Sequence, residues 1–217
     1  MTTPRDLLIT TLDVASSRLP GQGDLSLALA GGELIDLLNA RAAELDGDRI
    51  VPDESGAVDD RLLNEASAAL VRQAPYESVE DWLWRRGRGL AAVYLTDLRS
   101  EGQITRRRRS RWAPFGGDRI VLTDTPARRS ARERWTSNEP VLTSLGTAIG
   151  VRDQEHGQDE QEQQDQQDQQ LERLPDVADD AVETVLATVH NAVRDLEAER
   201  QRRSIEDAAF DNIWRGQ

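Results

Sequence analysis

The chain has 217 residues, of which 37% are hydrophobic and 31% charged, and its formal net charge is −13. This length predicts one domain with a substantial core and a spare tail, and it argues against two full domains. The absence of cysteine excludes disulfides, thiolate chemistry and cysteine-based zinc sites, which fits a cytosolic setting. No apolar run approaches the roughly 18 residues of a membrane span, and the first residues lack the pattern of a secretory leader.

Most of the chain has the apolar periodicity of amphipathic helices. Three core stripes recur at helical spacing: Leu27, Ala30, Gly31, Leu34 and Leu38; Leu62, Leu63, Ala66, Ala69 and Leu70; and Leu90, Val93, Tyr94 and Leu98. Because Gly31 and Gly32 lie inside a helical stripe, close packing explains them better than a phosphate-binding loop. Ser78 is the predicted N-cap of a short helix that extends to Arg86. The pattern predicts an all-α fold, a helical bundle with one β-hairpin.

The predicted hairpin, near residues 103–123, carries most of the positive charge. Between Arg85 and Trp135 there are fourteen arginines and five acids, a local balance of +9 in an acidic protein. Alternate strand residues face opposite sides, so Arg106 and Arg108 point one way and Arg107 and Arg109 the other. With charge on both faces, the stem is expected to project into solvent, and Trp112 and Phe115 add apolar surface at its tip. A simpler interpretation is that the arginines only protect an exposed strand edge from aggregation.

Helices resume after the hairpin and are then interrupted by a polar tract. Thr125 and Pro126 predict a helix start, and another helix is predicted from about Glu139 to Ile149. Residues 152–170 contain no apolar side chain, which predicts a disordered acidic linker. The expected organisation is a domain over 1–151, a linker over 152–172 and a C-terminal segment, 173–217, whose helix docks on the same domain. That helix is predicted to open at Asp176, with a core stripe of Val182, Val185, Val189, Ala192, Val193 and Leu196.

No residue pattern indicates catalysis, a metal site or a cofactor. The two histidines, His156 and His190, have no second histidine near enough to form a metal pair. Ser110 and the pair Ser16–Ser17 lack a basic partner at a recognisable spacing. The sequence therefore predicts a binding protein rather than an enzyme.

Five segments resemble, in the same order, the Golgi phosphoprotein 3 family, in its bacterial, actinobacterial-type branch. They are Asp6–Ile9, Leu27–Leu37, Asp60–Ala66, Ser78–Leu83 and Leu98–Ile104, and the similarity covers about residues 4 to 150 plus the final helix. The resemblance implies an almost all-α domain with one β-hairpin that is linked to oligomer formation. Eukaryotic members are peripheral Golgi proteins that bind phosphatidylinositol 4-phosphate in a basic surface pocket and act as sorting adaptors.

The resemblance allows the residues of that pocket to be compared with this sequence one by one. It aligns Ala30, Ala91 and Val93 with family positions that hold pocket arginines, and it keeps one basic position as Arg88. The loop from Asp13 to Ser26 lacks the family's pocket tryptophan. Bidentate guanidinium–phosphate contacts are strong, so their loss predicts weak and unselective binding of phosphatidylinositol 4-phosphate.

We expect a non-enzymatic, cytoplasmic protein that binds anionic phospholipid headgroups, peripherally on the inner face of the membrane. The candidate lipid-binding residues are Arg85, Arg86, Arg88, Arg106, Arg107, Arg108, Arg109 and Arg111. Trp112 and Phe115 are the candidate contacts for membrane insertion or for a homo-oligomer. Two alternatives stay open, a winged nucleic-acid-binding module and an assembly module whose hairpin docks on a sister subunit. Nucleic acid ranks second, because the helix from Leu90 to Glu101 has only Arg99 as a basic group and no side chain suited to reading bases.

Overall fold

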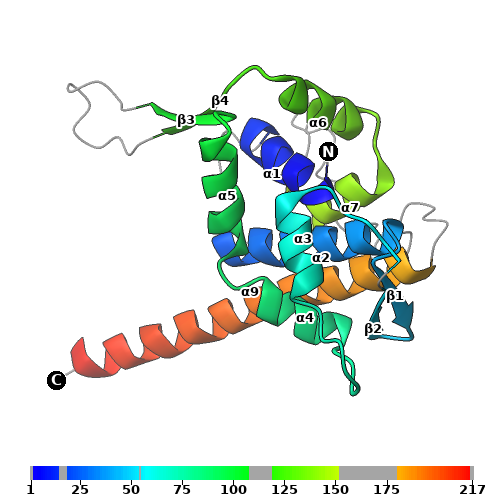
Figure 1. Cartoon of the computed structure of the whole chain (residues 1–217). Helices are drawn as coiled ribbons and strands as arrows, with labels where there is room; N and C mark the ends of the chain where they lie inside the picture. The colour runs from blue at the N-terminus through cyan, green and yellow to red at the C-terminus, as the bar shows by residue number, and fades with distance from the viewer. Residues whose placement is uncertain (1, 15–18, 54, 108–118, 152–179, 216–217) are drawn as a thin grey trace.

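The computed structural model describes residues 2–14, 19–53, 55–107, 119–151 and 180–215, and for 106, 107, 119 and 207–215 it describes the backbone alone. Helices dominate these ranges, which confirms the predicted helical bundle (Figure 1). The helices are α1 (Thr3–Val14), α2 (Gln22–Asn39), α3 (Arg61–Ala68), α4 (Val79–Arg86), α5 (Leu90–Ser100), α6 (Pro126–Thr136), α7 (Pro140–Ala148) and α9 (Asp180–Arg215). The strands are β1 (Ala43–Asp46), β2 (Arg49–Pro52), β3 (Ile104–Arg107) and β4 (Arg119–Leu122).

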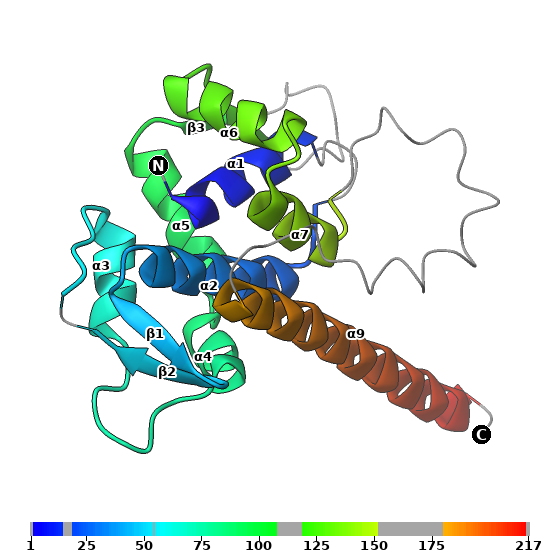
Figure 2. The ribbon, with the colours of Figure 1, turned by 90° about the vertical axis from the view of Figure 1, so that its right-hand side faces the viewer.

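Helix α2 is the centre of the bundle. Its side chains are buried almost all around, from Leu25 to Leu37, which is the pattern of a helix surrounded by others. It contacts α1, α3, α4, α5, α7 and α9. Figure 2 shows α9 crossing beside α2, with α1 and α6 stacked above α2, while α7 contacts both α2 and α9. The core is thus one contiguous cluster of apolar side chains centred on α2, and α6 packs on α1 at its outer edge.

Local hydrogen bonds fix where several helices begin. The Ser78 hydroxyl accepts a hydrogen bond from the backbone N–H of Asp81 at 3.1 Å and caps α4. The Thr125 hydroxyl accepts from the N–H of Arg128 at 3.2 Å and caps α6, with Pro126 in the first turn. Both starts agree with the predictions, and α7 agrees with the helix predicted from about Glu139 to Ile149.

Two antiparallel hairpins leave the helical body. Strands β3 and β4 pair in the register Ile104 to Leu122, which confirms the hairpin predicted near residues 103–123. The pairing of β1 with β2, which sets Leu45 opposite Ile50, is a second hairpin that was not predicted. Its turn passes through Gly47 at a φ of +61°, a conformation that glycine adopts without strain.

The final helix, α9, joins the core and then extends past it. At Gly31 of α2 a Cβ atom would lie 2.4 Å from Val189 Cγ2, so the absence of a side chain lets the two helices approach, as predicted from the helical stripe. The predicted α9 stripe is buried from Val182 to Val193, and Leu196 packs against the core edge. Arg200 still pairs with Asp24 of α2 at 2.7 Å; beyond it the helix projects from the body, and Ile205 is 70% exposed (Figures 1 and 2). The predicted linker over 152–172 and helix start at Asp176 lie outside the described residues.

Candidate anion-binding surface

Arg86, a predicted lipid ligand, is partly buried, and its guanidinium is turned toward a carboxylate in the core. Its guanidinium donates to both carboxylate oxygens of Glu33, Nε to Oε2 at 2.7 Å and Nη2 to Oε1 at 2.8 Å. The Tyr94 hydroxyl donates to the same carboxylate at 3.0 Å. Burial raises the pKa of Glu33, which is fully buried, and the Arg86 charge opposes that rise. The charge of Arg86 therefore balances a core carboxylate, a contact that sequence alone could not reveal across 53 residues.

Arg85 is exposed, but its charge is also paired. Its Nε and Nη2 donate to the two oxygens of Glu77 at 2.6 and 2.7 Å, and Nη2 also donates to the Ala69 carbonyl. The guanidinium carbon lies 5.3 Å from the centre of the Trp82 ring, within the range of a cation–π contact. Arg85 thus contributes more to the packing of α4 than to a free anion site.

Of the three predicted residues Arg85, Arg86 and Arg88, it is Arg88 that presents its charge at the surface. It is exposed between α4 and α5 and makes no ion pair with any described residue. It borders a cavity of about 240 Å³, whose other lining residues are Gln22, Gly23, Ser26, Leu27, Trp84, Gly87, Gly89, Ala91, Ala92 and Leu196. Helix α2 begins at this cavity, and helix N-termini attract anions, whereas the first N–H groups of α5 already donate to Gly87, Ser26 and Gly89. The cavity was not predicted, because its lining comes from helices that only the tertiary fold brings together.

The three positions that the resemblance aligns with pocket arginines differ from one another in burial. Ala30 is fully buried, and its carbonyl accepts a hydrogen bond from Trp82 Nε1 at 3.1 Å. Ala91 is buried at the cavity, where its N–H donates to the Ser26 hydroxyl. Val93 was predicted to be in the core, but it is 43% exposed. It lies at the edge of the apolar stripe formed by Leu90, Tyr94 and Leu98, so the stripe is narrower than predicted.

The exposed side of α5 has an unusual composition for this protein. Its exposed residues are Ala92, Val93, Thr96, Arg99 and Ser100, and none of them is acidic. The one carboxylate of the helix, Asp97, is buried and is paired with Arg5 and Arg61. In a chain with a net charge of −13, this helix face is apolar and basic.

The hairpin continues this surface away from the body. Figure 1 shows β3 and β4 extending from the end of α5 toward the same side to which α9 projects. Arg106 and Arg107 belong to β3, where the backbone alone is described. Arg108, Arg109, Arg111, Trp112 and Phe115 lie outside the described residues. The described part of the candidate surface therefore consists of Arg88, its cavity and the exposed side of α5.

A comparison with protein-family models identifies the family of the chain. The protein-family model described as Golgi phosphoprotein 3 (GPP34) matches residues 4–208, which includes every described helix and strand up to the projecting end of α9. No curated protein matches the chain. None of the helices in the described part of the chain combines the length and apolar character that crossing a bilayer requires.

Proposed function

Because the chain belongs to the Golgi phosphoprotein 3 family, we propose that it is a non-enzymatic protein that binds the headgroups of anionic phospholipids at a membrane surface. The observation that carries this proposal is the absence of any exposed carboxylate on α5, beside the unpaired Arg88, in a strongly acidic protein. For a surface that approaches an anionic membrane, the absence of negative charge matters more than a high density of positive charge. The proposed contact surface is therefore α5 with Arg88, Arg99 and the hairpin.

The net charge of the protein does not oppose this contact strongly. Charges farther away than a Debye length of about 8 Å are largely screened at physiological ionic strength. Each basic residue near an anionic lipid surface contributes about 1 kcal/mol. The five hairpin arginines, Arg106–Arg109 and Arg111, would then contribute about 5 kcal/mol, similar to one buried acyl chain. Trp112 and Phe115 suit the headgroup depth that aromatic side chains prefer.

The cavity beside Arg88 is the proposed position of the headgroup phosphate. Arg88 and the start of α2 can hold a single phosphate, but the first N–H groups of α5 already donate within the protein, and Ala30, Ala91 and Val93 supply no further cation. We expect binding to follow membrane charge, with little preference for phosphatidylinositol 4-phosphate over phosphatidylglycerol at equal charge. The proposed location is the inner face of the cytoplasmic membrane.

Vesicle co-sedimentation tests the proposal. The parent protein should bind vesicles that contain phosphatidylglycerol and should not bind vesicles of phosphatidylcholine alone. Replacing Arg88 and Arg99 by glutamine should weaken binding several-fold, since each position loses about 1 kcal/mol. The matched control replaces Arg49 and Arg194 by glutamine, which removes the same charge from β2 and α9, at positions that line neither the cavity beside Arg88 nor α5.

Three results would overturn the proposal. Equal losses in the two double variants would show that binding depends on total charge and not on α5. Binding to random duplex DNA in a gel shift, without binding to anionic vesicles, would favour the nucleic-acid alternative. Dissociation of a native oligomer by the hairpin changes Arg106→Glu and Arg108→Glu, without vesicle binding by the parent, would identify an assembly module.

A further inference from the structure

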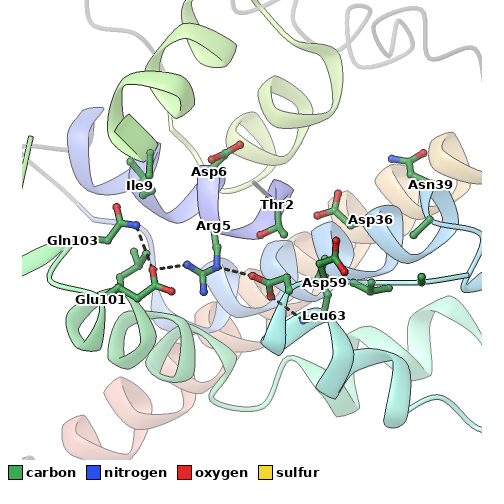
Figure 3. A pocket seen from close by; sticks show the side chains of 16 residues that line it. Thr2, Arg5, Asp6, Ile9, Asp36, Asn39, Asp59, Leu63, Glu101 and Gln103 are labelled. Atoms are coloured by element: carbon green, nitrogen blue, oxygen red, sulfur yellow. Dashed lines mark hydrogen bonds and ion pairs between the residues drawn. The ribbon is translucent and has the colours of Figure 1, made fainter. Parts of the chain in front are cut away.

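The acidic cluster at the end of α5, formed by Asp60, Asp97 and Glu101, is balanced within the chain. Arg5 Nε lies 3.0 Å from Asp60 Oδ2, and Nη1 lies 2.6 Å from Glu101 Oε2 (Figure 3). Asp97 pairs with both Arg5 and Arg61. These charges therefore act between α1, α3 and α5. The charges at the end of α9 are arranged differently, because the helix there extends past the body.

The end of α9 projects as an arm of residues 201–215, the α9 arm (Figures 1 and 2). At a rise of 1.5 Å per residue, the arm is about 22 Å long. Every residue from Gln201 to Glu206 is exposed, and Ile205 is the most exposed large hydrophobic residue in the described part of the chain. Helices of about 15 residues are marginal in water without packing, so a partner that covers the arm would stabilise it.

Uncharged residues recur along one face of the arm at alternating spacings of three and four. They are Ala198, Gln201, Ile205, Ala208 and Asn212, here called the α9 seam. Eight of the fifteen residues from 197 to 211 are charged, and none of the eight is at a seam position. This spacing is the pattern by which two helices pack along their length, and small residues at such positions let the helices approach closely.

The α9 seam is accessible to a partner because it lies on the outer face of the helix. Ile205 comes nine residues after Leu196, which is about two and a half turns. It is therefore on the side opposite to the stripe that packs on the core and ends at Leu196. A second molecule can reach the seam without displacing any contact of that stripe.

Charge changes sign along the arm. Residues 199–203 contain three arginines and one glutamate, a balance of +2, whereas residues 206–211 contain three acids and no basic residue. Arg202 and Arg203 both pair with Glu199, and one carboxylate cannot neutralise two guanidinium groups. Parallel arms would place blocks of like charge side by side, whereas antiparallel arms place each block beside its opposite. The order of charges therefore favours a second copy of the same arm in antiparallel orientation.

A groove of about 660 Å³ lies where the seam reaches the body. Ala198 lines this groove together with Asn191 and Arg194, which continue the three–four spacing of the seam toward the N-terminus of α9. The opposite wall is formed by Asp48, Val79 and Glu80, from the β1–β2 turn and the start of α4. The groove thus leaves room for the end of a second arm that packs along the seam.

We propose that two copies of the chain associate through their α9 arms, antiparallel, with the two-fold axis close to Ile205. This register packs the exposed Ile205 against that of the second copy. Arg202 and Glu206 lie on the same side of the seam, three residues before the axis and one residue after it. Each Arg202 is therefore within about 3 Å, measured along the helix, of Glu206 of the second copy. The interface uses neither α5 nor the arginine-rich hairpin, so it does not depend on the proposed lipid function.

Sedimentation velocity of the full chain tests the association. The parent should change from monomer to dimer over roughly micromolar concentrations, as expected for a small interface. Ile205→Glu places like charges at the two-fold axis and should weaken dimerisation about tenfold or more. Because Ile205 is 70% exposed, this variant should keep the helical content of the parent in circular dichroism. A parent that stays monomeric but binds anionic vesicles would overturn this proposal alone, as would equal dimerisation by Ile205→Glu.

A charge exchange tests the antiparallel orientation. Arg202→Glu should weaken dimerisation about fivefold, because it places a carboxylate beside Glu206 of the second copy. Combining it with Glu206→Arg restores opposite charges across the axis and should return dimerisation to nearly the parent level. The matched control is Arg203→Glu, since Arg203 also pairs with Glu199 but lies on the other side of the helix from Ile205.

The control variant should dimerise as the parent does. Equal losses in Arg202→Glu and Arg203→Glu, or no recovery in the exchanged variant, would overturn the proposed orientation. Dissociation of the dimer by the hairpin changes Arg106→Glu and Arg108→Glu, without an effect of Ile205→Glu, would place the interface on the hairpin and overturn the proposal.

Discussion

The two sides of helix α5 differ in charge. Its exposed side has no carboxylate and carries Arg99, with Arg88 just before the helix. On its other side Asp97, and Glu101 just after the helix, hold Arg5 in the acidic cluster. One helix therefore separates an exposed side without carboxylates from an acidic cluster that Arg5 and Arg61 balance. The comparison teaches that a net charge of −13 is an average over regions of opposite sign, and that the local distribution decides which partners are attracted.

The largest effect is expected where α5 is anchored between these two regions. Arg86→Leu would leave the fully buried Glu33 carboxylate, which also binds Tyr94 of α5, without its positive partner. Breaking a buried ion pair from one side costs about 3–5 kcal/mol, and this loss should appear in urea unfolding. The control Arg129→Leu breaks an exposed pair with Asp124 and should cost about 1 kcal/mol or less. Equal losses would show that Glu33 is protonated in the parent protein and needs no partner.

The next effect tests the acidic side. Arg5→Met would remove the cation shared by Asp60, Asp97 and Glu101, and it should destabilise the protein by about 2 kcal/mol in thermal unfolding. The same change leaves the acidic cluster more negative, and binding to anionic vesicles should not improve. A gain in vesicle binding would contradict the separation of the two regions by α5.

Introducing a carboxylate on the exposed side of α5 should remove the difference in charge between its two sides. Val93→Glu is made at a position that is 43% exposed, so stability should change by no more than about 0.5 kcal/mol. Binding to vesicles that contain phosphatidylglycerol should weaken about fivefold, because one charge near the lipid surface is worth about 1 kcal/mol. The control Val93→Gln is polar and neutral and should bind nearly as well as the parent. If both variants lose binding equally, apolar contact and not charge governs this surface.

The smallest effect is a change in pH dependence. Burial raises the pKa of Asp36 above its ordinary value of 3.8, so the folded state holds this proton more tightly than the unfolded state. The resulting stability is fully present below about pH 4 and is lost as the pH rises through the folded-state pKa. As the pH rises from 4 to neutral, the free energy of unfolding measured in urea should therefore fall less for Asp36→Asn than for the parent. An unchanged slope would contradict the inferred direction of the shift.

Features fixed by local chemistry could be predicted from the sequence. Ser78 and Thr125 cap helices because their hydroxyls lie within reach of N–H groups only three residues away. The hairpin of β3 and β4 follows from strand alternation, and even the unpredicted hairpin of β1 and β2 has a recognisable signal, the Asp46–Gly47 turn.

Features fixed by distant contacts could not be predicted. The sequence gives Arg85, Arg86 and Arg88 the same appearance, yet Glu77 pairs with the first and Glu33 with the second, and only Arg88 presents its charge. The same holds for Arg5, whose partners Asp60, Asp97 and Glu101 come from two later helical regions. Whether an arginine presents its charge at the surface can therefore be judged only when its tertiary partners are known.

The packing of α9 on α2 has a consequence for folding during synthesis of the protein. Gly31 receives Val189, a residue more than 150 positions later, so this face of the central helix stays uncovered while the ribosome synthesises the intervening chain. The core can close only after the segment from Val182 to Val193 has been synthesised. A message truncated before Val182 would therefore yield a chain whose central helix exposes apolar surface.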